Sequence, residues 1–163
     1  MCIILDGLCP VDRHCYLFLI NMKRKIVVEI LSSLLILLFV YTSVSKWLAF
    51  NTFVGQMNNQ PFPNWLTPII VWTLPAIEII ISLLLMFGRT QLMGFRASLI
   101  LMLLFTVYTF LVLINVFGRR PCACGGVIEN LTWGQHLVFN LFFVGVATAG
   151  ILLKKREANP SIS

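Results

Sequence analysis

The stretch "LTPIIVWTLPAIEIIISLLLMF", residues 66–87, decides the fold class of this chain. It is apolar almost throughout, and it is long enough to cross the hydrocarbon core of a bilayer, about 30 Å thick, which takes roughly 20 helical residues. It lacks the alternation of polar and apolar residues of a barrel strand. Because a segment in lipid must satisfy its own backbone hydrogen bonds, we predict a transmembrane helix.

Three further segments have the same character, at residues 26–47, 95–117 and 133–153. The whole chain of 163 residues is 59% hydrophobic and only 11% charged, with a mean hydropathy of +0.93. These values lie far from those of an average soluble domain. We therefore predict an all-α fold, an integral membrane bundle of four helices.

The distribution of Lys and Arg predicts the orientation of the bundle. With a cytoplasmic N-terminus, that side holds nine of these residues and the opposite side holds three, at positions 46, 119 and 120. The excess favours an N-in, C-in topology in a bacterial cytoplasmic membrane, with residues 118–132 on the periplasmic side. The net charge of +6 is mostly explained by this topology and does not indicate nucleic-acid binding.

The first 21 residues fit poorly with the rest of the chain. They contain three scattered cysteines, and they precede a second methionine, Met22, in "MKRKIVVEI". We interpret residues 1–21 as a non-native start or a disordered extension, residues 22–157 as the membrane domain, and residues 158–163 as a cytoplasmic tail. A weaker alternative makes the first apolar run a cleaved signal peptide that ends near residues 43–45.

The longest predicted connection on the outer side is residues 50–65, "FNTFVGQMNNQPFPNW". Its apolar residues at 50, 53, 54 and 57 would share one face of a short helix at the membrane interface. A loop with a few buried aromatic residues is the alternative. Three tryptophans mark the predicted outer helix ends as an aromatic belt: Trp47, Trp65 and Trp133.

Two cysteines separated by one residue, Cys122 and Cys124, lie in the predicted outer loop "FGRRPCACGG". Two extended residues span about 6.6 to 7.2 Å, whereas bridged cysteines have Cα atoms about 4.4 to 6.8 Å apart, so a disulfide here requires a bend. Pro121 and the glycines at 125 and 126 can supply it. So small a ring is strained, and strained disulfides are the labile and catalytic ones.

The charged residues around the cysteines favour the same interpretation. Arg119 and Arg120 would stabilise a thiolate, and the predicted helix that follows would place its positive N-terminal end near the loop. A copper or zinc site is the alternative, although no third cysteine lies in the predicted outer loops, and His136 is twelve positions beyond Cys124. A structural staple would remove little chain entropy from so short a loop.

The fourth predicted helix begins with capping-box spacing, T-x-x-Q, at Thr132 and Gln135. One turn further on, His136 and Asn140 are i, i+4 neighbours and face the same way. His136 can relay protons during thiol exchange. A hydrogen bond between helices is the other interpretation of this pair.

Polar residues inside membrane spans are costly and therefore informative. Glu78 follows Pro75 by three positions in the second span, and a lone carboxylate there should be neutral or paired. Lys46 in "VSKW" is the nearest plausible cation. Tyr108 and Asn115 in the third span complete a predicted polar patch. The Lys46–Glu78 pair can serve in proton handling, in holding a quinone, or in packing alone.

Three motifs together resemble the MauE/DoxX group of redox-associated membrane proteins, in particular its methylamine utilisation MauE branch. They are "VSKW" (44–47), "LPAIEIIISLLL" (74–85) and "CACGG" (122–126). The resemblance covers about residues 22–155, and by position it carries over only Lys46, Glu78, Cys122 and Cys124. It implies a cytoplasmic-membrane protein that supports the processing or disulfide formation of an exported amine dehydrogenase small subunit, often beside a thioredoxin-like partner.

We therefore expect thiol–disulfide exchange between the Cys122/Cys124 pair and an exported thioredoxin-like or cysteine-containing protein. Since the predicted spans between residues 26 and 117 contain no cysteine, the electrons go to a quinone or to a second exported protein. Two other classes remain as alternatives: a carrier of quinone or a small solute that depends on Glu78 and Lys46, and a non-catalytic assembly subunit.

Overall fold

The computed structural model describes residues 11–60, 63, 65–116 and 132–158, with the side chains of residues 11–21 and 158 left aside. Within these residues the protein is helical and has no strand, which confirms the predicted all-α class. The helices, in chain order, are α1 (Val11–Leu48), α2 (Phe50–Asn58), α3 (Thr67–Met86), α4 (Gln91–Leu113) and α5 (Trp133–Ala158).

Four of the described helices are long and apolar enough to cross a membrane: Met22–Leu48 within α1, Thr67–Met86, Gln91–Leu113, and Trp133–Glu157 within α5. They coincide with the four predicted spans, so the four-helix membrane bundle is confirmed. Helix α1 begins at Val11, well before the predicted span. The interpretation of residues 1–21 as a non-native start or a disordered extension stays a prediction, and residues 1–10 and 159–163 lie outside the described part.

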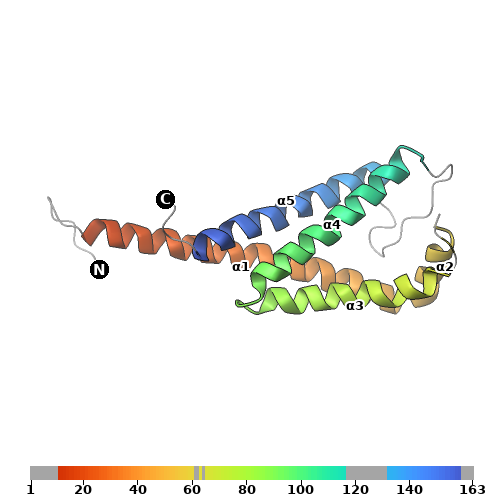
Figure 1. Ribbon diagram of the computed structural model, residues 1–163, viewed down its shortest axis with the longest axis horizontal. Coiled ribbons are helices and arrows are strands. Elements are labelled where there is room, and N and C mark those ends of the chain that lie inside the picture. The colour runs from red at the N-terminus through yellow and green to blue at the C-terminus, as the bar shows by residue number, and fades with distance from the viewer. Residues whose placement is uncertain (1–10, 61–62, 64, 117–131, 159–163) are drawn as a thin grey trace.

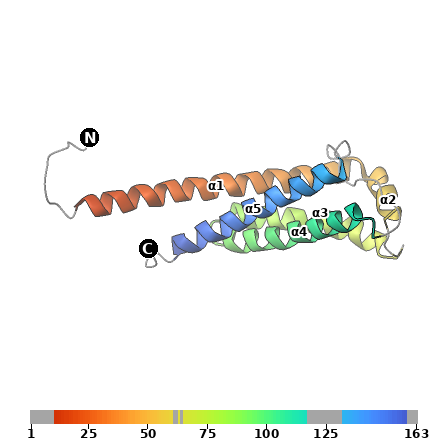
Figure 2. The ribbon, with the colours of Figure 1, turned by 90° about the horizontal axis from the view of Figure 1, so that it is seen from above.

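The four spans form a ring in which α1 packs on α3, α3 on α4, α4 on α5, and α5 on α1. Helix α1 begins, and α5 ends, at the same end of the bundle, as an even number of spans requires (Figures 1 and 2). The first part of α1 projects beyond the other helices. The short helix α2 lies at the opposite end, and the α1/α3 pair and the α4/α5 pair separate toward it (Figure 1).

The outer surface of the bundle is apolar on every span. Large hydrophobic side chains such as Leu37, Trp72, Leu104 and Phe142 are more than half exposed. In water such a surface would drive aggregation, whereas in lipid it is the expected surface of a spanning helix. The buried core is comparatively small and includes Leu35, Phe39, Leu85, Phe95 and Phe143.

Close helix contact at the end of the bundle away from α2 depends on two glycines. A Cβ atom on Gly150 of α5 would lie 2.3 Å from the Phe95 ring of α4, and one on Gly94 would lie 2.9 Å from Leu85 of α3. Small residues at these positions let the backbones approach, as is usual for helices packed in membranes. The fully buried Phe95 therefore fills the space that Gly150 leaves.

Helix α4 ends at Leu113, earlier than the predicted limit at residue 117. Asn115 has a φ of 59°, and its N–H donates to Val112 O while Val116 N–H donates to Leu111 O. These two bonds form a Schellman motif, in which a left-handed residue closes the helix. The prediction failed here because hydropathy continues past the point at which Asn115 turns the backbone.

The predicted short helix in residues 50–65 is confirmed as α2. Phe53 is buried, and residues 50, 54 and 57 are half-buried on the same side. Next to it, the Trp72 ring contacts Phe50 at 5.5 Å and Trp47 at 5.9 Å between centroids. The alternative of a loop with a few buried aromatic residues is therefore wrong. The position of α2 at a membrane interface stays a prediction.

Candidate functional site

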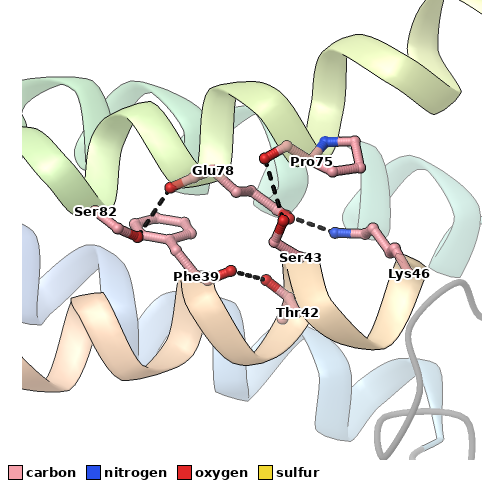
Figure 3. A network of polar contacts seen from close by, with 7 residues as sticks. All are labelled: Phe39, Thr42, Ser43, Lys46, Pro75, Glu78 and Ser82. Atoms are coloured by element: carbon pink, nitrogen blue, oxygen red, sulfur yellow. Dashed lines mark hydrogen bonds and ion pairs between the residues drawn. The ribbon is translucent and has the colours of Figure 1, made fainter. Parts of the chain in front are cut away.

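A buried ion pair joins α1 to α3. Lys46 Nζ lies 2.5 Å from Glu78 Oε1, and the two side chains are only 7% and 1% exposed (Figure 3). Lys46 stands in the last turn of α1, and its side chain reaches inward to meet the carboxylate of the antiparallel helix α3. The predicted pairing of Lys46 with Glu78 is thus confirmed. Burial without a partner would cost each group several kcal/mol, in the range of roughly 3–5 kcal/mol for a broken pair.

Hydroxyl groups align the two helices around this pair (Figure 3). Ser43 Oγ donates to Pro75 O at 3.2 Å, and Ser32 Oγ donates to Leu85 O at 3.0 Å. Pro75 has no N–H, so it cannot continue the hydrogen-bond ladder of α3 at that turn, and neighbouring helices and hydroxyls stabilise such an interruption. Ser82 Oγ donates to Glu78 O at 2.9 Å within α3. The register of α1 on α3 is therefore fixed on both sides of Glu78.

One oxygen of the Glu78 carboxylate lacks a hydrogen-bond donor among the described residues. Glu78 Oε2 is buried and accepts no hydrogen bond from the described residues. The Thr42 side chain lies beside the carboxylate, but its hydroxyl donates to Phe39 O at 3.1 Å. A buried acceptor without a donor is uncommon in native proteins and asks for an explanation. Glu78 also lines a cavity.

The cavity has a volume of about 420 Å³ and lies in the half of the bundle nearer α2. All five helices contribute to its wall, which is mainly apolar and includes Phe39, Phe53, Leu74, Met102 and Phe105. Polar side chains also line it, namely Thr42, Lys46, Gln60, Glu78, Tyr108, Thr109, His136 and Asn140. Apolar walls with a few placed polar groups are typical of small-molecule sites.

On the α4 side of the cavity, polar groups are paired with one another. Tyr108 Oη donates to Gln60 Oε1, and Asn140 Nδ2 of α5 donates to Thr109 Oγ1 at 3.2 Å. The Thr109 hydroxyl in turn donates to Phe105 O at 2.7 Å. Asn140 therefore makes the hydrogen bond between helices that was one of the two interpretations of the His136/Asn140 pair.

His136 stands in the first turn of α5, on the same side as Asn140, and both line the cavity. Its Nδ1 atom is buried without a hydrogen-bond partner among the described residues. Its ring lies beside Trp133, at 6.3 Å between centroids. The capping box that places His136 is confirmed, since Thr132 N–H donates to Gln135 Oε1 at 2.9 Å and Gln135 N–H donates to Thr132 Oγ1 at 3.4 Å.

The predicted polar patch is only partly correct. Tyr108 lines the cavity as expected, whereas Asn115 is exposed at the end of α4 and does not contribute to the cavity wall. Its left-handed conformation explains the difference, because the chain turns away there from the helical face on which Tyr108 lies. Sequence reasoning also missed Gln60 and Thr109, which hydrogen-bond across to other elements. The sequence marks these two residues only as polar positions within or beside an apolar segment.

Four predicted site residues lie outside the described part of the chain: Arg119, Arg120, Cys122 and Cys124. The described ends on either side of them, Val116 and Thr132, both belong to the end of the bundle at which α2 and the cavity lie. Among the described residues, no group of three His, Cys, Asp or Glu side chains lies close enough to hold a metal ion. The alternative of a copper or zinc site depends on Cys122 and Cys124, which lie outside the described residues, so it stays a prediction.

The part of the chain that contains this site matches a known protein family. Residues 24–153, which include α3, α4, most of α5 and both members of the ion pair, match the model of the methylamine utilisation protein MauE. This chain belongs to the MauE family. The predicted resemblance is thereby confirmed for MauE, while the link to DoxX stays a prediction. Comparisons with curated proteins and with solved structures gave no match.

Family membership and the four apolar spans together make this a multi-pass membrane protein of the MauE family. The matched range includes all or most of each of the four apolar spans. Both Lys46 and Glu78, which carried the resemblance by position, lie within that range and in direct contact. The ion pair is therefore a structural feature of the part of the chain that defines the family match.

Proposed function

We propose that this MauE-family protein supports the maturation of exported proteins by thiol–disulfide exchange at Cys122 and Cys124. In this proposal the chain lies in the bacterial cytoplasmic membrane with the cysteine segment on the periplasmic side. Its partner is an exported thioredoxin-like or cysteine-containing protein. The family name points to methylamine utilisation, with the amine dehydrogenase small subunit as the protein that is matured.

The observation that carries the proposal is the place where the cysteine segment is attached. Helix α4 stops at a Schellman motif and α5 starts at a capping box, so both ends of the segment are firmly defined at one end of the bundle. That end also holds the polar cavity with Lys46, Glu78 and His136. The segment that contains Cys122 and Cys124 therefore begins and ends at the end of the bundle that has proton-carrying groups.

The exchange itself is a pair of substitutions at sulfur. A thiolate of the partner attacks one sulfur of the Cys122–Cys124 disulfide, so that one intermolecular S–S bond forms and the internal S–S bond breaks. The second partner thiolate then attacks the mixed disulfide and releases this chain as a dithiol. The partner loses two electrons and the cysteine pair gains them. Arg119 and Arg120 stabilise the thiolate that leaves in the first step.

Trapping the intermediate tests the proposal. In a background with serine at positions 2, 9 and 15, the single variant Cys124→Ser has no internal disulfide and keeps one loop thiol. This thiol can enter the exchange in the reverse direction, by attacking the disulfide of an oxidised partner, but the variant lacks the second thiol that would complete that direction. We expect an adduct with an exported protein, visible by non-reducing electrophoresis and identified by mass spectrometry. Cys122→Ser is tested in parallel, and the double variant is the control. Absence of an adduct with both single variants would contradict exchange and favour a non-catalytic assembly subunit.

A further inference from the structure

The electron pair taken up by the cysteines needs a destination that the chain itself does not contain. Between residues 16 and 121 the sequence has no cysteine, so a thiol relay through the spans is excluded. The acceptor must therefore reach the outer end of the bundle from elsewhere. A two-electron acceptor that dissolves in the bilayer can do so without crossing a polar region.

We propose that the cavity lined by Lys46, Glu78 and His136 binds the ring of a lipid-soluble quinone, which oxidises the Cys122/Cys124 dithiol. This inference rests on the proposed function. A quinone ring is flat and apolar and carries two carbonyl oxygens that accept hydrogen bonds. The cavity matches this chemistry, because its volume of about 420 Å³ and its apolar wall suit a ring, and its polar groups are few.

Hydrogen-bond donors are available on two sides of the cavity. Lys46 Nζ carries three N–H groups, and the described structure bonds it to Glu78 Oε1 alone. His136, on α5, has a buried Nδ1 atom without a partner among the described residues. Glu78 Oε2 is a second buried polar atom of the cavity-lining residues without a hydrogen-bond partner there. A carbonyl compound bound here would give Lys46 and His136 acceptors, and its reduced hydroxyl form would give Glu78 Oε2 a donor.

A lateral opening provides room for the tail of such a molecule. Leu104 of α4 lines the cavity, and yet its side chain is 63% exposed on the lipid-facing surface. Ile70 of α3, which is half-buried, lines the cavity opposite α4. The cavity wall therefore includes residues of α3 and α4 that are accessible from outside the bundle, and the proposed route for the tail runs between these two helices. An alkyl or isoprenoid tail can leave by this route into the bilayer while the ring stays inside.

The redox step balances with these groups. The two thiols lose two electrons and two protons as the Cys122–Cys124 bond forms, and the quinone gains two electrons and two protons to become a quinol. One proton reaches each ring oxygen, from His136 on one side and from the Lys46–Glu78 pair on the other. The protons released by the thiols replace them. The quinol then leaves through the opening between α3 and α4.

Binding is measured on the purified full chain in detergent with decylubiquinone as the probe. Trp133 lines the cavity, so a bound quinone should quench tryptophan fluorescence in a saturable way. Leu104→Trp narrows the opening and should weaken binding about tenfold or more, which corresponds to about 1.4 kcal/mol. Leu103→Trp is the matched control, since Leu103 is also exposed on α4 but does not line the cavity. Because each variant adds one tryptophan, quenching is expressed relative to the fluorescence of the same variant without quinone.

Two further arms separate this inference from the proposed function. The Cys122→Ser/Cys124→Ser variant should bind decylubiquinone as the parent does, because the proposed contacts to the ring come from Lys46, Glu78 and His136. In the Cys124→Ser background, Leu104→Trp should still trap the mixed disulfide. In the protein that keeps both loop cysteines, Leu104→Trp should lose most of the dithiol-dependent reduction of decylubiquinone. If the adduct forms while wild-type protein shows no saturable quinone binding, the quinone site is wrong and exchange stands.

Competition for the cavity distinguishes a site that is specific for quinones from one that binds any apolar molecule. Decylbenzene has the ring and the tail but neither carbonyl oxygen, and an excess of it should fail to displace decylubiquinone. Displacement by decylbenzene, or by brominated phospholipid at similar concentration, would show that the cavity holds any acyl or alkyl chain and would overturn the proposal. Equal weakening by Leu104→Trp and Leu103→Trp would place the bound quinone elsewhere, with the same consequence.

Discussion

Lys46 and Glu78 form a direct ion pair between α1 and α3, with Nζ and Oε1 2.5 Å apart and both side chains buried. Removal of one partner leaves the other without a counter-charge. We therefore expect Lys46→Met and Glu78→Leu each to lower the free energy of unfolding by about 3–5 kcal/mol, whereas the double variant should lose much less, because burial of two apolar side chains carries no charge penalty. Unfolding titrations in mixed micelles measure all three.

The matched control for this pair lies at the other end of the bundle. Lys154 Nζ and Glu157 Oε2 are 3.0 Å apart on α5, one turn from each other, and are more exposed than the first pair. Lys154→Met should therefore cost only about 0.5 kcal/mol or less. Equal effects at Lys46 and Lys154, or a double variant as unstable as the two single variants combined, would contradict a coupled buried pair.

Helix packing at Gly150 gives a second prediction. A Cβ atom at this position would lie 2.3 Å from the fully buried Phe95 ring. Gly150→Ala should therefore lower the free energy of unfolding by about 1–3 kcal/mol. Gly145→Ala is the control, because nothing lies within 4 Å of its Cβ position. That variant should be neutral or up to about 1 kcal/mol more stable, through the higher helix propensity of alanine.

Thermal unfolding in one detergent is sufficient to compare the two glycine variants. The decisive outcome is the order of their midpoints, since both substitutions add one methyl group to the same helix. A Gly150→Ala midpoint at or above that of Gly145→Ala would mean that α4 and α5 do not approach closely at Phe95.

The end of α4 depends on the left-handed backbone at Asn115. Its φ of 59° suits glycine and asparagine and costs other residues about 1–2 kcal/mol. Because the side chain is exposed, packing contributes little. We expect Asn115→Gly to leave the free energy of unfolding nearly unchanged and Asn115→Val to lower it by about 1–2 kcal/mol. Hydrogen exchange of the Val116 amide reports the motif directly, and equal protection in both variants would contradict it.

The sequence predicted the parts of this structure that depend on hydropathy and local chemistry. The four spans follow from apolar length, and the start of α5 follows from the side chains of Thr132 and Gln135. The Lys46–Glu78 contact was also predictable, because two charges in lipid-spanning segments have strong reason to meet. These features need only nearby residues or one strong interaction.

Other features depend on geometry that apolar composition does not encode. The cavity is lined by residues from all five helices, so it depends on how these helices are arranged. The α1/α3 and α4/α5 pairs separate toward α2 (Figure 1), and no residue in those spans signals that divergence. Hydropathy also carried the third span past Asn115, since Ile114, Val116 and Phe117 are as apolar as the helix before them. The bonds from Asn140 to Thr109 and from Tyr108 to Gln60 require the register of helices that are distant in sequence.

The final prediction concerns the side of the membrane on which the cysteine segment lies. The turn between α3 and α4 contains Gly88, and the segment between α4 and α5 contains Cys122, so the two lie at opposite ends of α4. The Lys and Arg excess predicts that the Gly88 turn is cytoplasmic. Two single-cysteine proteins test this, one that keeps only Cys122 and one that carries only Gly88→Cys, with all other cysteines replaced by serine.

In intact cells, a membrane-impermeant maleimide should label the protein that keeps Cys122 and should leave the Gly88→Cys protein unlabelled until the membrane is opened. Gly88 is a suitable position because a Cβ there meets nothing within 4 Å, so the substitution should not disturb the turn. Labelling after permeabilisation confirms that each thiol is reactive. The reverse pattern would put Cys122 in the reducing cytoplasm, where a labile disulfide does not persist, and would remove the chemical basis of thiol–disulfide exchange with an exported partner.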